Sequence, residues 1–429
     1  MILKRIWRQV QGQTYARIGK NALALLAGQV GARLFNLLLV GQLARLAGTA
    51  ALGRYLLAMT VEAITLAVID LGLNPFVTRE FARQDVPEQD ALWGTVLAIK
   101  LLAAAIGCVL LNAFLVPILW SGERGALISI ALLALLPDAF VGLVTARVKA
   151  QQQMEVSSAI GLGIRLASTL GGLALLWAGW GVGAVLWAYV LSSTGGSLAF
   201  ICVLRRWQVR AHWAGWHHRA KAVWREALPF ALTGIVAILY MRLDLLIISY
   251  SKGDLAAGIY GAAYRVWEAI GMIPSSLLDA LFPELSRLGG DRDRLSAFYR
   301  RGRRLMLGVI ILLMLPAWVV APMLMSLLYG AGTSTPEAII LLRLLMLAFP
   351  FPFLYLLAGN ALYAVDRQSK VTVAMVVATA FKAAAGLVVI GWWSYWGAAC
   401  VALAAEVLLW ASLQGMARRF VLRPSRTSK

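Results

Sequence analysis

The sequence predicts an all-α integral membrane protein with twelve transmembrane helices in two homologous six-helix lobes around a central cleft. Of its 429 residues 61% are hydrophobic and only 14% are charged, and the mean hydropathy is +0.76. A soluble chain of this length would have too few polar side chains to cover its surface. Apolar runs of 18 or more residues recur along the sequence, as membrane helices require.

The elements follow from these apolar runs. Residues 1–20 mix basic and apolar side chains, which is typical of an amphipathic helix on a membrane surface. Twelve predicted spans follow, at residues 21–43, 54–77, 91–119, 126–146, 157–178, 181–204, 228–249, 256–284, 305–328, 338–363, 371–391 and 397–417. The predicted organisation is an N-lobe at 1–204, a basic inter-lobe loop at 205–227, a C-lobe at 228–417 and a basic tail at 418–429.

The distribution of lysine and arginine predicts the orientation. With both termini in the cytoplasm, the inner segments hold 29 of these residues and the outer turns hold four. Cytoplasmic loops of membrane proteins carry such an excess of positive charge. The net charge of +20 is therefore explained by membrane topology, and we expect no nucleic-acid partner.

A repeated pattern supports two related halves. Gly53-Arg54-Tyr55 matches Gly258-Ile259-Tyr260 at an offset of 205 residues. Small residues match at an offset of 214, namely Ala150, Gly183, Ala184 and Ala188 with Ala364, Gly397, Ala398 and Ala402. Because six helices is an even number, both halves insert the same way up. This arrangement predicts a pseudo-two-fold axis along the membrane normal and a substrate site near the midplane.

Ionisable side chains interrupt the apolar spans. A charge at mid-bilayer costs at least about 2.5–3.5 kcal/mol on insertion scales, so such residues face a bundle interior or a wet cavity. Fourteen lie at predicted membrane depth: Arg33, Glu62, Asp70, Lys100, Asp138, Arg165, Arg242, Asp244, Arg265, Glu268, Asp279, Arg343, Lys382 and Glu406. Five of them fall between residues 228 and 286, which predicts a transporter.

The motifs of that stretch resemble the polysaccharide flippases of the multidrug, oligosaccharidyl-lipid and polysaccharide exporter superfamily. They are Leu228-Pro229, Asp244, Gly258-Ile259-Tyr260, Ala263-Tyr264-Arg265 and Phe282-Pro283-Glu284-Leu285-Ser286. The first half carries a companion pattern of Arg45-Leu46-Ala47-Gly48, Leu52-Gly53-Arg54-Tyr55, Asp70-Leu71-Gly72-Leu73 and Arg79. Peptidoglycan-precursor flippases of this superfamily usually have fourteen helices, so twelve favours the oligosaccharide branch.

The resemblance implies a function. It implies ion-coupled translocation of an undecaprenyl-pyrophosphate-linked oligosaccharide from the cytoplasmic to the outer leaflet, by alternating access, for O-antigen, capsule or exopolysaccharide synthesis. The implied location is a bacterial or archaeal cytoplasmic membrane. The implied partners are the lipid-linked substrate, membrane lipids, and polysaccharide polymerase or glycosyltransferases, with no cofactor.

Cations at membrane depth suit a pyrophosphate group. Arginine offers a planar fork to phosphate oxygens and lysine a point charge. We expect substrate contacts from Arg33, Arg165, Arg242 and Lys382, and then from Arg265 and Lys100. The alternative is internal ion pairing, of Arg242 with Asp244 and of Arg265 with Glu268. Asp138 and Arg343 are interpreted as structural.

Buried acids are candidates for the coupling ion, because burial disfavours the charged form of a carboxyl group. The candidates are Glu62, Asp70, Asp244 and Glu268, and the alternative is that they only neutralise arginines. No metal site is expected. His212, His217 and His218 lie among tryptophans in a basic loop, which is typical of an interfacial segment.

Two other function classes compete with this reading. A drug exporter of the same superfamily would need an acidic cleft for organic cations, whereas half of the fourteen membrane-depth charges here are basic. A membrane glycosyltransferase or polymerase would need a sizeable outer loop with catalytic groups. The longest predicted outer turn, from Tyr329 to Glu337, is too short, so we expect no enzyme.

Overall fold

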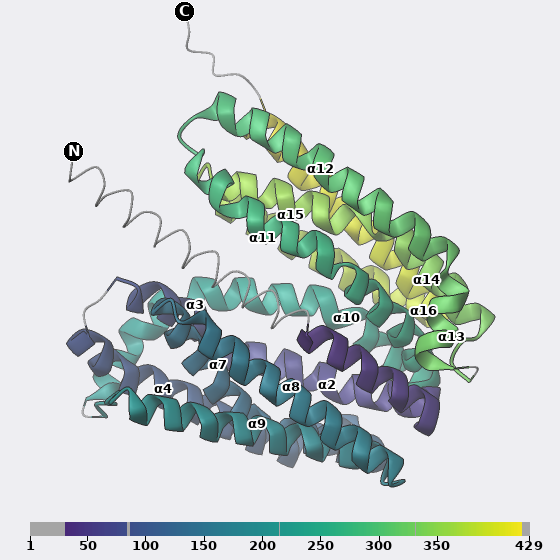
Figure 1. Cartoon of the computed structure of the whole chain (residues 1–429), viewed down its shortest axis with the longest axis horizontal. Helices are drawn as coiled ribbons and strands as arrows, with labels where there is room; N and C mark the ends of the chain where they lie inside the picture. The colour runs from purple at the N-terminus through teal and green to yellow at the C-terminus, as the bar shows by residue number, and fades with distance from the viewer. Residues whose placement is uncertain (1–30, 84–85, 214, 331, 423–429) are drawn as a thin grey trace, which may run out of the picture. The chain divides into compact units, whose positions relative to one another are not determined.

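The computed structural model describes residues 31–422, except 84, 85, 214 and 331. The predicted amphipathic segment at 1–20, part of the first span and part of the tail lie outside the described residues. Within them, every regular element is a helix, as the composition predicts (Figure 1). The first is residues 31–47, where the structural description begins inside a helix.

The remaining elements follow in chain order, with short turns between them. They are α2 (Thr49–Asp70), α3 (Leu73–Phe81), α4 (Val86–Leu110), the π-helical turn η1 (Leu111–Leu115), α5 (Val116–Leu119), α6 (Gly122–Leu132), α7 (Leu135–Ala150), α8 (Met154–Trp177), α9 (Gly181–Arg206), α10 (Trp216–Ile270), α11 (Met272–Arg287), α12 (Arg292–Val319), α13 (Ala321–Tyr329), α14 (Pro336–Ala348), α15 (Pro350–Tyr363) and α16 (Gln368–Phe420).

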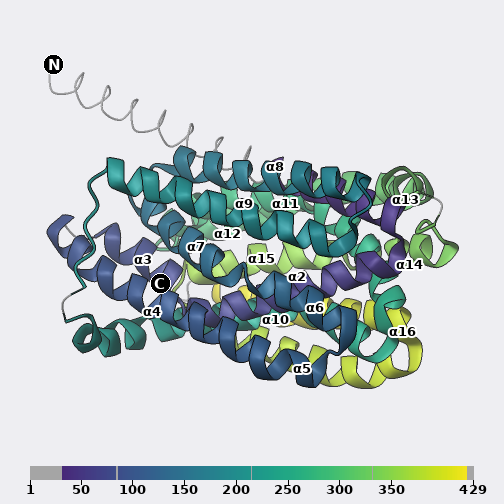
Figure 2. The ribbon, with the colours of Figure 1, turned by 90° about the horizontal axis from the view of Figure 1, so that it is seen from below.

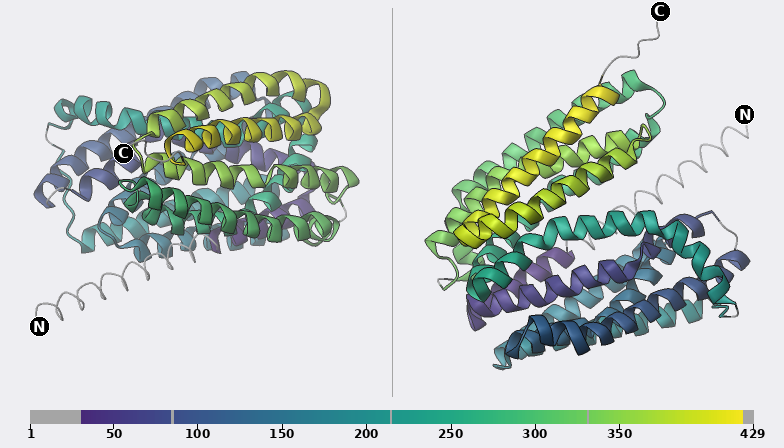
Figure 3. Two further views of the ribbon diagram at one scale, coloured as in Figure 1. Left: turned by 90° about the horizontal axis from the view of Figure 1, so that it is seen from above. Right: turned by 180° about the vertical axis from the view of Figure 1, so that it is seen from behind.

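Nine helical segments of the described residues are long and apolar enough to cross a membrane. Two of them, α10 with 55 residues and α16 with 53, would each be about 80 Å long if they were straight, at 1.5 Å per residue, which is over twice the thickness of a hydrocarbon core. A non-helical residue divides each into two arms, Gly253 in α10 and Ser394 in α16. Figure 3 shows the chain of α16 reversing between its arms. The count of twelve spans stays a prediction.

The chain forms two compact units. Unit 1 comprises the described residues up to Leu39 and Val61–Gly234, and unit 2 comprises Val40–Thr60 and Ile235–Lys429. Residues 40–60, which belong to the predicted N-lobe, therefore pack with unit 2. The division of the chain into lobes at 204 and 228 stays a prediction.

The core of unit 1 is formed by α3, α4, α7, α9 and the beginning of α10, and α7 packs against α3, α4 and α9 (Figure 2). Phe76, Phe81 and Phe200 are among its buried residues. The buried Arg147 Nη2 lies 3.1 Å from Asp90 Oδ1, and its guanidinium lies 5.0 Å from the ring centroid of Trp93. The ion pair and the aromatic contact join the end of α7 to the beginning of α4.

In unit 2, α11, α12 and α15 lie side by side (Figure 1), and α15 also packs on α16. The inward faces carry fully buried residues such as Met306 and Leu357. Large apolar side chains are exposed on the outward faces, including Leu312 at 72% and Leu387 at 67%. A water-soluble surface would not expose so many, whereas lipid would cover them.

Two glycines of the repeat pattern meet at one helix crossing in unit 2. A Cβ added at Gly53 of α2 would lie 1.9 Å from the carbonyl oxygen of Asp254, and one at Gly258 of α10 would lie 2.0 Å from that of Thr49. The two contacts are related by the offset of 205 residues, which pairs 49 with 254 and 53 with 258. The helices thus approach backbone to backbone, as small residues permit in membrane proteins.

The change Gly53→Ala is expected to lower stability by about 1–3 kcal/mol, because the added methyl group must push two backbones apart. The measurement is the midpoint of heat-induced loss of the monodisperse peak in detergent. Gly161→Ala in α8 is the control, because a Cβ there meets nothing within 4 Å. Equal midpoints for the two variants would contradict the close approach.

Candidate functional site

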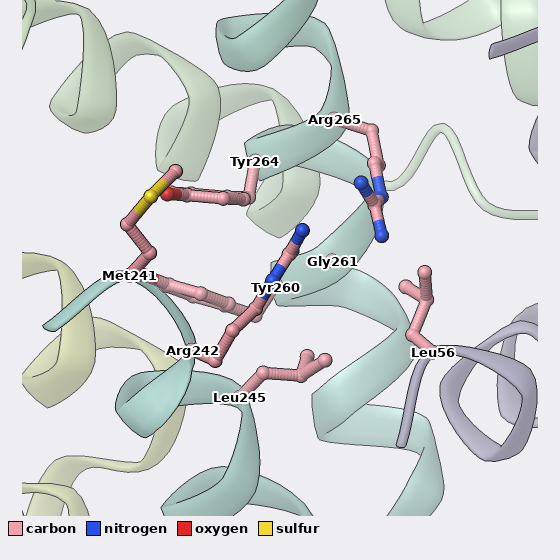
Figure 4. A pocket seen from close by; sticks show the side chains of 8 residues that line it. All are labelled: Leu56, Met241, Arg242, Leu245, Tyr260, Gly261, Tyr264 and Arg265. Carbon is pink, nitrogen blue, oxygen red and sulfur yellow. The ribbon is translucent and has the colours of Figure 1, made fainter. Parts of the chain in front are cut away.

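A small pocket in unit 2 is formed by the two arms of α10 and by α2. Its lining residues are Leu56, Met241, Arg242, Leu245, Tyr260, Gly261, Tyr264 and Arg265 (Figure 4). The second arm contributes two pairs of residues spaced four apart, 260 with 264 and 261 with 265. Because residues four apart share a helix face, the two pairs line neighbouring parts of one side of this arm. The arms are adjacent because the chain breaks at Gly253, where φ is 84°.

Two arginines of this pocket share one carboxylate. Arg265 Nη1 lies 2.7 Å from Glu268 Oε2, and Arg242 Nη1 lies 3.7 Å from Glu268 Oε1. Figure 4 shows both guanidinium groups directed into the pocket from different arms. Because two guanidinium groups share one carboxylate, these three side chains together carry one net positive charge at the wall of an apolar pocket. Such a site favours an anion with several oxygen atoms.

Aromatic rings continue from the pocket along α10 to α15. The ring of Tyr264 is stacked between those of Tyr260 and Trp267, at centroid separations of 5.9 and 5.4 Å. Trp267 in turn contacts Phe349 and Phe353. Two of these rings, Tyr260 and Tyr264, line the pocket together with the arginines. Apolar surroundings lower the local dielectric, which strengthens the interaction of a cation with an anionic ligand.

The alternative pairing of Arg242 with Asp244 is wrong. Residues two apart on a helix point to nearly opposite sides, so they do not face each other. Asp244 Oδ2 instead lies 2.8 Å from Lys382 Nζ of α16 and accepts a hydrogen bond of 2.9 Å from the Tyr260 hydroxyl. The pairing of Arg265 with Glu268, predicted from their spacing, is confirmed.

Lys382 belongs to this second, buried cluster and does not line the pocket. Its side chain is 5% exposed, and its Nζ also donates to the carbonyl oxygen of Tyr240 at 2.8 Å. Glu406, on the other arm of α16, interacts electrostatically with Lys382 and Asp244. Glu406, Tyr240 and the aromatic rings were not predicted as site residues. The membrane depth of Glu406 was the only sequence signal for it.

The predicted residues of unit 1 fall in separate places. Lys100 is buried and bonds to Asp70 and, at 2.6 Å, to Asn74 Oδ1. The guanidinium of Arg165 in α8 lies 5.8 Å from the ring centroid of Tyr189. Arg33 is exposed on the helical segment 31–47 and has no ion pair within the described part of the chain.

Asp138 is the centre of a polar group in unit 1. It accepts hydrogen bonds from Ser193 and, at 2.5 Å, from the Tyr189 hydroxyl. Glu62 and Arg165 interact with it electrostatically. These partners fit the structural role predicted for Asp138. Among the described residues, no group of three or more histidine, cysteine, aspartate or glutamate side chains is placed to hold a metal ion.

Comparisons with known proteins relate the chain to one family and one fold. The sequence profile of the family described as polysaccharide biosynthesis protein matches residues 18–289, and the MatE profile matches 229–388. No curated protein sequence matches the chain.

Solved structures share the fold at low sequence identity. A lipid II flippase, MurJ, in an inward closed conformation has a TM-score of 0.79 at 14% identity, over 91% of this chain and 87% of that one. A multidrug resistance MATE family transporter of the MOP superfamily, in an inward-facing conformation, has a TM-score of 0.71 at 14% identity, over 92% and 98%. A MATE family transporter of the same superfamily in an outward-facing conformation has a TM-score of 0.67 at 15% identity, over 95% and 96%.

The long apolar helices and the apolar outer faces of the described residues define a multi-pass membrane protein, and its fold is the one shared by the MurJ flippase and the MATE transporters. Within that class, the chain belongs to the polysaccharide biosynthesis protein family, whose profile covers more than half of its length.

Proposed function

We propose that this protein flips an undecaprenyl-pyrophosphate-linked oligosaccharide from the cytoplasmic to the outer leaflet of the cell membrane by alternating access. The product would serve the synthesis of a surface polysaccharide such as O-antigen, capsule or exopolysaccharide. The observation that carries this proposal is the pair of arginines, Arg242 and Arg265, that share Glu268 at the wall of the pocket.

The contacts of Glu268 set the chemistry of this pocket. The longer contact, 3.7 Å to Arg242, is the weaker of the two, so Arg242 is the guanidinium that a ligand can recruit first. A pyrophosphate bears about two negative charges and would bind Arg242 through two oxygens, as the planar fork allows. Arg265 would keep Glu268 in place at 2.7 Å and add its charge at short range.

Oligosaccharide flipping is favoured over drug export by the state of the carboxylates. An exporter of organic cations would need a carboxylate that is not neutralised by the protein. The carboxylate at the arginine pocket, Glu268, is paired with Arg265 and Arg242, and Asp244 is paired with Lys382. The MatE match over 229–388 supports a shared fold of the second half and is compatible with either cargo.

A deletion experiment tests the cellular function. In a strain without a redundant flippase, loss of the protein should leave lipid-linked oligosaccharide in the cytoplasmic leaflet, while the sugars are still assembled. Surface polysaccharide should disappear and return when the wild-type chain is supplied. Normal delivery of the oligosaccharide to the outer leaflet without the protein would refute the proposal.

A further inference from the structure

The two ends of α16 in unit 2 bring three cations to one aromatic ring. The guanidinium groups of Arg367 and Arg419 lie 4.8 and 5.5 Å from the ring centroid of Phe420. The ammonium nitrogen of Lys370 lies 5.2 Å from the same centroid. Arg367 and Lys370 stand at the beginning of α16, whereas Arg419 lies in its last turn. These ends meet because the chain of α16 reverses at Ser394 (Figure 3).

Within the described residues, no acid is paired with these three cations. Each of the three side chains is exposed and forms no ion pair, and Asp366, the acid nearest to them in sequence, forms none either. All three charges lie within 5.5 Å of one ring centroid. Exposed charges interact over about 8 Å at physiological ionic strength, so these cations repel one another. A bound anion would remove this repulsion.

The helix dipole of α16 adds to the positive potential at this place. The N-terminus of a helix is the positive end of its dipole, which an acidic residue or a capping side chain usually offsets. The beginning of α16 has no acidic residue in its first turn and no side-chain cap, and Arg367 occupies the N-cap position. Two cations at the positive end of a helix are unfavourable unless an anion binds there.

Two further arginines lie near the end of α16, around a buried hydrogen bond between α12 and α16. The Tyr299 hydroxyl donates this bond to Gln414 Oε1 at 2.7 Å. Arg303 lies one turn from Tyr299 on α12, because residues four apart share a helix face. Arg418 lies one turn from Gln414 on α16 for the same reason. Both arginines interact electrostatically with Tyr299, and neither has an ion pair in the part of the chain that the structure describes.

Hydrogen-bond acceptors are missing around these two arginines. Arg303 Nε and Gln414 Nε2 are buried and have no hydrogen-bond partner among the described residues. A buried donor without an acceptor is unfavourable, so oxygen atoms from outside the chain are expected here. Water would supply the oxygen atoms but not the negative charge that unpaired arginines favour. An anion with several oxygen atoms supplies both.

The depth of the cations in the membrane identifies the source of this anion. The predicted spans begin at 305 and 371 and end at 417, so Arg303, Lys370 and Arg418 each lie within two residues of a span end. Apolar side chains that face outward begin directly beyond them, with Leu305 at 52% and Val373 at 62% exposed. Cations next to outward-facing apolar side chains mark the boundary between acyl chains and headgroups. A phosphate at this depth belongs to a lipid headgroup.

We propose that this end of unit 2 binds the headgroup of an anionic phospholipid in the cytoplasmic leaflet. The phosphate lies among Arg367, Lys370 and Arg419, and the acyl chains lie along the outward apolar faces of α12 and α16. Clusters of basic residues next to membrane spans attract anionic lipids in this way. A zwitterionic headgroup such as phosphatidylethanolamine carries an ammonium group of its own, which the three cations repel. The site does not depend on the substrate that the protein transports.

Native mass spectrometry of the full-length protein in detergent tests the site. The protein is titrated with phosphatidylglycerol and, separately, with phosphatidylethanolamine of the same acyl chains, and the dissociation constant of the first bound lipid is measured. The wild type should bind phosphatidylglycerol more tightly by about tenfold or more. The triple variant with Arg367→Gln, Lys370→Gln and Arg419→Gln should lose this preference. Its fold should survive, because all three side chains are exposed.

The matched control is the triple variant with Arg205→Gln, Arg206→Gln and Arg210→Gln. These arginines are also exposed and lie in the predicted basic inter-lobe loop, so the control removes the same charge from another basic segment. It should bind the first phosphatidylglycerol with wild-type affinity. An equal loss of affinity in the two triple variants would show that the lipid responds to net charge alone, and it would overturn the site.

Three results with the wild-type chain would overturn the proposal without any variant. The first is equal affinity for phosphatidylglycerol and phosphatidylethanolamine. The second is displacement of bound phosphatidylglycerol by inorganic phosphate at the same concentration, which would assign the site to a free anion. The third is preferential binding of undecaprenyl pyrophosphate over phosphatidylglycerol, which would assign the site to the transported lipid. A failure of the flipping assay would refute the proposed function and leave the phospholipid result standing.

Discussion

Replacing Arg242 by glutamine is expected to slow the flipping of pyrophosphate-linked oligosaccharide by roughly 30- to 1000-fold, because loss of a charged contact to a desolvated anion costs about 2–4 kcal/mol. The fold should survive, since Glu268 keeps its contact of 2.7 Å with Arg265. Arg242→Lys should recover part of the rate, because the charge returns without the planar fork. The measurement is the initial flipping rate in vesicles at equal protein content.

The matched control for this change is Arg294→Gln. Arg294 is also in unit 2, but it is exposed at the beginning of α12, where it pairs with Asp291 at 3.2 Å. Exposed ion pairs contribute little to stability, so this variant should flip at the wild-type rate. If Arg242→Gln flips as fast as Arg294→Gln, Arg242 is not a substrate contact.

Replacing Lys382 by methionine is expected to cost about 3–5 kcal/mol of stability, because it leaves the buried Asp244 without its cation. The double change Asp244→Leu with Lys382→Met should recover most of the loss, since replacing both members of a buried ion pair by apolar side chains is often tolerated. The measurement is the midpoint of thermal unfolding in detergent.

Lys252→Met serves as the control for the loss of a lysine, because Lys252 is exposed beside the break in α10. Its unfolding midpoint should equal that of the wild type. A Lys382→Met midpoint close to this control would show that the ion pair with Asp244 does not stabilise unit 2. A double variant as unstable as the single one would show that Lys382 stabilises through other contacts.

Patterns local in sequence predicted the structure well. The apolar runs predicted helices of membrane-spanning length, and the spacing of Arg265 and Glu268 predicted their ion pair. Both depend on interactions within one helix, which its periodicity determines. The predicted pairing of Arg242 with Asp244 was wrong because it considered only their proximity in sequence. The same helical periodicity directs side chains two residues apart to nearly opposite sides.

Contacts between helices could not be predicted from spacing. Lys382 reaches Asp244 from another helix, and Arg242 reaches Glu268 only because α10 folds back at Gly253. The Gly53–Gly258 crossing is an intermediate case. The repeat identified both glycines, but only the packing of α2 against α10 showed that they lie at one crossing. Glu406 was recognised as an acid at membrane depth, but its neighbours Lys382, Tyr240 and Asp244 come from the other arm of α16 and from α10.

The most direct test of the proposed function is flipping by the purified protein. Vesicles that contain the protein and undecaprenyl-pyrophosphate-linked oligosaccharide are treated with a membrane-impermeant enzyme that removes the sugar from the outer leaflet. With the wild-type chain, the inner-leaflet pool should become accessible within the assay, and with Arg242→Gln it should remain largely protected. The contradicting result has two parts. The inner-leaflet pool stays protected with the wild-type chain, and the same chain transports a lipophilic cation in the same vesicles, which shows that it is active.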